Sequence, residues 1–153
     1  MKVATIALVA ALLTACHTQE KNTKEVAAGT EDKTQMSTRN CYQYASNGDS
    51  VSLYITRAHA GDLVTGTLTY KLKEKDKNEG AVRGSIKNDI LLADYLFMSE
   101  GQVSTRQVAF KLEGHSLTEG YGEMTERHNK LLFKNPDSLN FDNRIKLLEV
   151  VCQ

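Results

Sequence analysis

Short segments in which apolar and polar residues alternate are the feature that most constrains the fold of this chain. The segment VTGTLTYKL at 64–72 places Val64, Leu68 and Tyr70 on one face and threonine and lysine side chains on the other. A β-strand turns successive side chains to opposite faces, so this pattern predicts a half-buried strand. Similar segments occur at 50–56, 81–87, 92–97, 106–112, 117–124, 130–134 and 145–152. We therefore expect an all-β fold.

Residues typical of turns separate these segments. They lie at 47–49, 61–62, 88–89, 99–101, 113–115, 128–129 and 135–137. Connections this short join antiparallel neighbours. About eight such strands form a meander, which removes its exposed edges by closing on itself. We predict a small antiparallel up-and-down β-barrel over 40–153, with a flattened sandwich as the alternative.

The last segment permits two interpretations. Ile145, Leu148 and Val151 have the spacing of one helix face, so a helical turn could begin there. The short apolar run that ends at Cys152 fits a closing strand better, and we prefer the strand.

The N-terminus predicts an export signal. Lys2 is followed by residues 3–13, which are apolar apart from Thr5 and shorter than the roughly 20 residues of a membrane-spanning helix. The sequence Leu13-Thr14-Ala15-Cys16 resembles the bacterial lipobox. That resemblance implies a lipoprotein signal peptide at 1–15 and lipidation (palmitate or a similar acyl chain) of Cys16, which would anchor the protein to a membrane. An ordinary secretory signal followed by a chance cysteine is the alternative.

Residues 17–39 predict a flexible tether, so that 16–39 comprises the lipidated cysteine and its linker. Val26 and Met36 are its large apolar residues, and acidic and basic side chains balance. Such a segment buries too little apolar surface to offset the entropy of ordering. His17 rather than Asp follows the cysteine, which in the sorting scheme that the lipobox implies favours the outer membrane.

The charge of the chain argues against a nucleic-acid partner. The sequence has 19 Lys and Arg and 19 Asp and Glu, and of these only Lys2 lies in the signal, so the mature charge is −1. Binding to nucleic acid is expected to need a basic patch. The same balance gives no support for binding anionic lipid by charge.

Two cysteines flank the domain. Cys41 and Cys152 are an even pair in a chain that we expect to be exported, and such a pair most simply forms a disulfide. Two free thiols are the alternative. No cysteine or histidine lies at metal-ligand spacing from either one, so we predict no metal site here.

Several of these segments together resemble a known group of proteins. They are CYQYASNGDSVSLYI, VTGTLTYKLKEKDKNEGAVRGSI, DILLADYLFMSEG and EGYGEM. They resemble a group of small lipoproteins from Bacteroidetes-type bacteria, which has no assigned activity, and the likeness covers most of 41–152. In architecture the chain also resembles lipocalin-like barrels. Neither resemblance implies catalytic or binding residues, because a fold does not fix a function.

Two polar side chains are the candidate ligand-binding residues. Arg106 shares a strand face with Val108 and Phe110, and Tyr95 shares one with Phe97. If these faces point into a barrel, an inward arginine must be paired or lie at the open mouth, since an unpaired buried charge is costly. Arg106 and Tyr95 could orient the polar head of a ligand. We favour a structural role, in which Arg106 pairs at one barrel end with Asp94, Glu100 or backbone carbonyls.

Other polar residues give weaker signals. His59, His115 and His128 lie in predicted turns without the spacing of a zinc site, so we expect no metal or cofactor. Glu119 and Glu123 share a face with Tyr121, and paired acids can act in general acid–base catalysis. We interpret them instead as the solvent face of a strand.

These patterns favour a lipid-anchored, non-enzymatic binding or interaction module of the cell envelope. Its partner is a small apolar ligand or another envelope protein. The alternative is an inhibitor or accessory protein that docks on an envelope enzyme through the charged segment at Lys73–Gly80. An enzyme acting at the mouth of the barrel is the third and weakest hypothesis.

Overall fold

The computed structural model describes residues 37–58, 61–142 and 145–153, which belong to one compact unit. No α-helix occurs in these ranges. The elements are β1 (Thr38–Ser46), β2 (Asp49–Arg57), β3 (Leu63–Lys71), β4 (Asn78–Lys87), β5 (Ile90–Ser99), β6 (Gln102–Glu113), β7 (Ser116–Gly120), β8 (Met124–Arg127), β9 (Lys130–Phe133), the 3₁₀ turn η1 (Pro136–Ser138) and β10 (Lys146–Val150).

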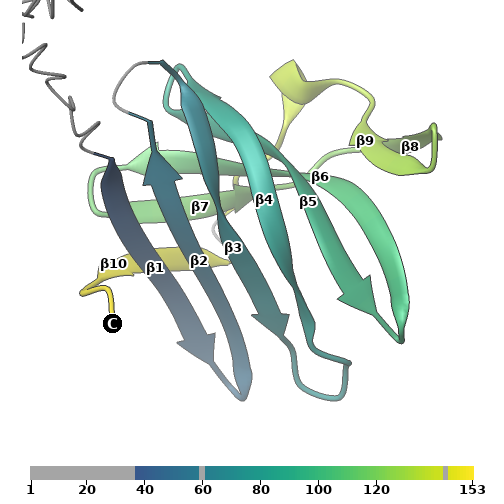
Figure 1. Cartoon of the computed structure of the whole chain (residues 1–153), viewed down its shortest axis with the longest axis horizontal. Coiled ribbons are helices and arrows are strands. Elements are labelled where there is room, and N and C mark those ends of the chain that lie inside the picture. Colours follow the sequence, from purple (N-terminus) through teal and green to yellow (C-terminus); the bar gives the residue numbers. More distant parts are fainter. Residues whose placement is uncertain (1–36, 59–60, 143–144) are drawn as a thin grey trace, which may run out of the picture. The chain divides into compact units, whose positions relative to one another are not determined.

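Eight of the strands form a closed antiparallel barrel in sequence order (Figure 1). Their spatial order is β5-β4-β3-β2-β1-β10-β7-β6, and pairing between β5 and β6 closes the ring. The predicted all-β meander barrel is therefore confirmed. The β8–β9 hairpin, which the alternation placed in the same series, lies outside the ring. It attaches through β9, which runs parallel to β6 with Thr105 opposite Lys130 and Arg106 opposite Leu131.

The predicted turns owe their geometry to residues that tolerate a positive φ. Asn47 and Gly48 join β1 to β2 with φ of 53° and 90°, and Glu100 and Gly101 join β5 to β6 with φ of 49° and 77°. Two-residue turns with both φ angles positive match the right-handed twist of the strands that they connect. These turns fix the register of each hairpin, and the register decides which side chains face inward.

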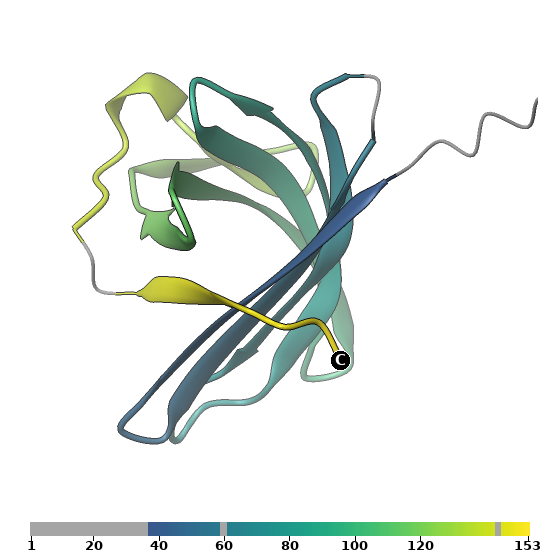
Figure 2. The same ribbon diagram turned by 90° about the vertical axis from the view of Figure 1, so that its left-hand side faces the viewer.

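The last strand and the disulfide close the ring. Strand β10 pairs with β1, where Cys41 lies opposite Val150, and with β7, where Lys146 lies opposite Thr118. Figure 2 shows β10 beside β1. Cys41 and Cys152 form a disulfide with their Cα atoms 5.3 Å apart. Both predictions, a closing strand and a disulfide, are confirmed.

Glycines allow the sheet to coil tightly enough to close. A Cβ added to Gly66 would collide with the carbonyl oxygen of Tyr54 on β2, and one added to Gly80 would collide with that of Leu96 on β5. Glycine inside a strand marks a place where another backbone approaches closely or where a sheet bends to close. Only glycine, which has no side chain, fits at these two positions.

The interior of the barrel is filled by its own side chains. One apolar cluster joins the inner faces of the barrel strands, and Leu53, Leu68, Phe110 and Leu117 in it are fully buried. An eight-stranded barrel has an interior just wide enough for side chains to fill or for one small ligand. Here the side chains occupy it.

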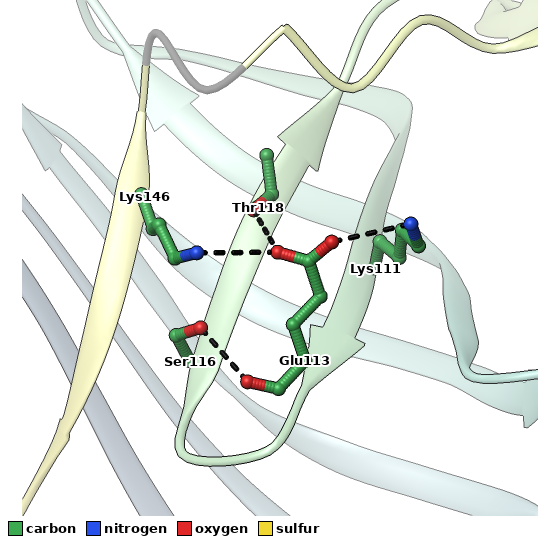
Figure 3. Close-up of polar contacts among 5 residues, drawn as sticks. All are labelled: Lys111, Glu113, Ser116, Thr118 and Lys146. Atoms are coloured by element: carbon green, nitrogen blue, oxygen red, sulfur yellow. Dashed lines mark hydrogen bonds and ion pairs between the residues drawn. The ribbon is translucent and has the colours of Figure 1, made fainter.

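A polar network links three strands (Figure 3). The Glu113 carboxylate lies 3.2 Å from Lys111 Nζ and 3.3 Å from Lys146 Nζ, and it accepts a hydrogen bond from Thr118 Oγ1. Ser116 Oγ donates to the Glu113 carbonyl at 2.9 Å. Lys111 first, then Lys146, lowers the pKa of Glu113. The network ties β6, β7 and β10 together where the chain closes.

Three predictions lie outside the described residues: the signal peptide at 1–15, the lipidated Cys16 with residues 17–36 of its tether, and His59. The predicted end of the tether at residue 39 is wrong, because Thr38 and Arg39 belong to β1 and pair with β2. Within the part of the chain that the structure describes, no helix is long and apolar enough to cross a membrane.

Candidate functional site

Tyr95 and Arg106, the two residues predicted from their strand faces, come together. They lie directly opposite each other on β5 and β6. The Arg106 guanidinium carbon is 5.0 Å from the ring centroid of Tyr70, 5.8 Å from that of Tyr95 and 5.9 Å from that of Phe97. A guanidinium within about 6 Å of an aromatic ring gains a cation–π attraction. Three rings therefore hold the charged end of Arg106.

Neither of the two carboxylates expected to pair with Arg106 does so. The Asp94 carboxylate accepts instead from Lys130 Nζ at 2.7 Å, because Asp94 is adjacent in sequence to Tyr95 and points to the opposite face of β5. Among the described residues, Arg106 makes no ion pair with Glu100 either. The Arg106 Nε atom is buried and has no hydrogen-bond partner. A buried donor of this kind normally has a partner, an ordered water or a ligand.

Glu119 provides the negative charge of this site, and its assignment to a solvent face is wrong. Its register opposite Phe110 turns it into the barrel, where it is 5% exposed. Tyr70 Oη donates to Glu119 Oε1 at 2.6 Å and Tyr121 Oη donates to Oε2 at 3.0 Å. The sequence held a signal, since Glu119 shares strand parity with the apolar Leu117. Its main partner, Tyr70, is 49 residues away along the chain.

Burial controls the titration of this group. Burial raises the pKa of Glu119, while the hydrogen bond from Tyr70 and the charge of Arg106 oppose that rise. The pKa of Tyr70 lies well above its usual value because of burial and the neighbouring Glu119 charge. Burial raises the pKa of Tyr95 to about 12, against the opposing charge of Arg106. Both phenols therefore keep their protons at neutral pH, and Tyr70 acts as a donor.

Tyr95 carries a second unpartnered group. Its side chain is fully buried, and its ring stacks on Phe97 at 4.7 Å between centroids. The Tyr95 hydroxyl oxygen has no hydrogen-bond partner. An arginine nitrogen and a phenol oxygen without partners thus lie on opposed residues of β5 and β6, next to the filled core.

A hollow of about 360 Å³ opens beside Arg106. Its walls come from the end of β5, the beginning of β6 and the β8–β9 hairpin: Phe97, Val103, Ser104, Thr105, Arg106, Glu126, Asn129, Lys130 and Leu131. Phe97, Val103 and Leu131 make part of this wall apolar. Of the two basic residues, Lys130 is already paired with Asp94. Arg106 is therefore the available cation of the hollow.

The charged segment at Lys73–Gly80 divides between a loop and a strand. Asn78 and Gly80 belong to β4, where both pair with β3 and Gly80 also pairs with β5, so the connection itself is the stretch 72–77. This connection and the β5–β6 turn border a second, polar hollow of about 550 Å³, lined by Glu74, Lys75, Asp76, Asn78, Ser99 and Glu100.

The histidines in the described part of the chain lie in turns, as predicted. His115 Nδ1 contacts the Glu149 carboxylate, which also accepts from Asn40 Nδ2 at 3.0 Å. His115 is the main cause of the lowered pKa of Glu149. His128 occupies the β8–β9 turn with a φ of 52°. Across residues 37–58, 61–142 and 145–153, no group of three His, Cys, Asp or Glu side chains is arranged to hold a metal ion.

Comparison with models of known protein families, with curated proteins and with solved structures gives no match to this chain. These comparisons identify no family for the resemblance to small Bacteroidetes-type lipoproteins. The structure shows an eight-stranded antiparallel barrel with the Cys41–Cys152 disulfide. The candidate site is therefore interpreted from its own geometry.

Proposed function

We propose that the protein is a lipid-anchored, non-enzymatic binding module of the cell envelope, which engages its partner in the hollow beside Arg106. One observation carries this proposal: Arg106 has a buried, unpartnered Nε and lines a partly apolar hollow of about 360 Å³. Cavities of about 300–1,000 Å³ with apolar walls and few polar groups are typical of ligand sites.

The filled core supports binding at the rim of the barrel. The side chains that fill the interior, among them Leu53, Leu68 and Phe110, are fully buried. A ligand inside the barrel would have to displace them, which costs several kcal/mol for large apolar side chains. The partner in this proposal binds between β6 and the β8–β9 hairpin and leaves the core intact.

The anchor in this proposal is Cys16, through the Leu13-Thr14-Ala15-Cys16 lipobox resemblance. Its test is the mass of the N-terminal peptide from protein purified from membranes of the native host. We expect mature protein that begins at Cys16 and carries acyl chains on that residue. An unacylated N-terminal peptide would refute the anchor and leave the binding proposal untouched.

The binding site is tested in intact cells with the full chain. A photo-crosslinking amino acid replaces Val103 in the hollow, or Lys71 on β3 as the control position. We expect an adduct from position 103 that is lost on Arg106→Gln and kept on Arg83→Gln, a matched exposed arginine on β4. Adducts that form equally in all backgrounds, or none from position 103, would contradict the proposal.

An inhibitor that docks through the connection at 72–77 is the second candidate. The polar hollow that this connection borders with the β5–β6 turn supports it. Crosslinking from Lys75 distinguishes the two. An adduct from Lys75 that is independent of Arg106, without one from Val103, would favour the inhibitor.

A further inference from the structure

The backbone groups of β6 alternate between its two edges. Leu112 N donates to Asp89 O on the β5 side at 2.7 Å. Strand β6 is antiparallel to β5, and β7 and β9 pair with β6 on its other side. In an antiparallel pair, residues whose bonds point away from one neighbour recur at every second position. Odd-numbered residues of β6 therefore turn their N–H and C=O groups away from β5.

Val103 is an odd-numbered residue of β6 near the β5–β6 turn, and no strand pairs with it on the side away from β5. Pairing with β7 covers 109–113 and pairing with β9 covers 105–106. Figure 1 shows the β5–β6 hairpin running on past the β8–β9 hairpin. Val103 is 67% exposed, and within the described ranges its backbone has no partner on this edge. A free donor and a free acceptor thus lie next to the hollow, in line with β9.

We infer that this edge accepts an extended peptide with a free C-terminal carboxylate, which adds to β6 as a parallel strand in line with β9 and places its carboxylate on Arg106. The inference rests on the proposed function and names the partner class. Strand addition to an exposed edge supplies affinity through main-chain hydrogen bonds and specificity through the pockets for alternate side chains.

The parallel direction follows from the position of the charge. A strand that runs with β6 along 102–104 ends where β9 begins, and there Arg106 and Asn129 line the hollow. A carboxylate at that end meets the positive charge of Arg106, which lines the hollow. An antiparallel peptide would bring its amino terminus to the same place, where the like charge of Arg106 repels it.

The remaining wall residues limit the sequence of the peptide. Val103 and Leu131, 67% and 40% exposed, offer apolar contact to its side chains. Glu126 lines the same hollow, and Lys130 already forms an ion pair with Asp94. A second acidic group on the peptide therefore finds no basic partner there. The peptide that fits best is apolar or neutral and has its negative charge at the C-terminus.

The test uses the mature lipoprotein in detergent micelles and the peptide acetyl-Val-Thr-Val as the probe. We expect the free acid to bind about tenfold or more tightly than the C-terminal amide, the size of one charge-assisted hydrogen bond. Arg106→Gln removes this difference, while Arg83→Gln keeps it. Binding protects the Val103 amide from hydrogen exchange, and N-methylation of the peptide amide that faces β6 abolishes binding.

Sodium decanoate, which has a carboxylate but no peptide backbone, separates the possible failures. Binding of decanoate through Arg106 without binding of the peptide would overturn strand addition and leave the binding module standing. Equal affinity of the acid and the amide would overturn the role of the carboxylate. No probe binding together with no adduct from Val103 in cells would overturn both proposals.

Discussion

Removing the Cys41–Cys152 disulfide is expected to destabilise the barrel strongly. The bridge closes a loop with a sequence separation of 111 residues. Confining the ends of so long a loop in the unfolded chain corresponds to about 5 kcal/mol at 25 °C in the chain-entropy account. Small domains have a total unfolding free energy of about 5–15 kcal/mol. The bridge therefore accounts for a large part of the stability of this fold.

The location of the bridge adds a second reason. The first and last strands of the chain, β1 and β10, pair over three residue pairs, whereas β1 and β2 pair over nine. The pairing between the first and last strands is therefore the shorter of the two pairings that β1 makes, and the disulfide lies beside it. Without the bridge, this pairing should open before the rest of the barrel.

Equilibrium unfolding in guanidinium chloride, followed by circular dichroism, measures the effect. The samples are the oxidised protein, the same protein reduced, and the Cys41→Ala/Cys152→Ala variant. We expect both changed samples to lose about 4–5 kcal/mol and to show a larger dependence on denaturant, because an unbridged unfolded chain exposes more surface. Reduction controls for the side chain lost at Cys41, which is 1% exposed. A loss below about 1 kcal/mol with an unchanged denaturant slope would refute this account.

Two further predictions concern the polar groups inside the barrel. Tyr95→Phe removes a buried hydroxyl without a partner and should leave stability unchanged or raise it. Tyr70→Phe removes a hydrogen-bond donor to the Glu119 carboxylate and should lower the free energy of unfolding in urea by about 1.5–3 kcal/mol. Equal losses from the two substitutions would contradict the hydrogen-bond assignment. The raised pKa of Glu119 means that the folded protein binds the proton of this side chain more tightly than the unfolded chain does. Protonation of Glu119 therefore stabilises the fold fully below pH 4.5, the ordinary pKa of glutamate, and this stabilisation disappears as pH rises through the raised pKa of the folded state. The measured quantity is the free energy of unfolding of the native protein minus that of Glu119→Gln. This difference should fall between pH 4.5 and neutral pH, by at most about 1.4 kcal/mol per pH unit. A difference that does not vary with pH would refute the raised pKa of Glu119.

Alternation and turn chemistry were sufficient to predict the barrel. The segment at 64–72 became β3, and the predicted turn at Asn47-Gly48 is present, with positive φ angles at both residues. Each of these features depends on neighbours a few residues away. The sequence therefore contains them directly.

The place of the β8–β9 hairpin and the environment of Glu119 were not predictable in the same way. β8 and β9 have four residues each, too few for alternation to indicate a partner, and their attachment to β6 depends on where β7 ends. Glu119 could be placed on a face with Leu117, but no local pattern indicated that the inner face would carry a donor from β3. Both outcomes depend on contacts between residues far apart in the sequence.

The closed ring also determines how the barrel bears a mechanical load. Strand β1 begins at Thr38, which lies opposite Arg57, while Val103 lies next to the β5–β6 turn at the other end of the strands. A pull between the proposed anchor at the N-terminus and the proposed partner at Val103 would act along β1. The nine residue pairs between β1 and β2 would then be sheared together instead of being peeled apart one at a time. An attachment with this geometry resists detachment through the whole strand at once.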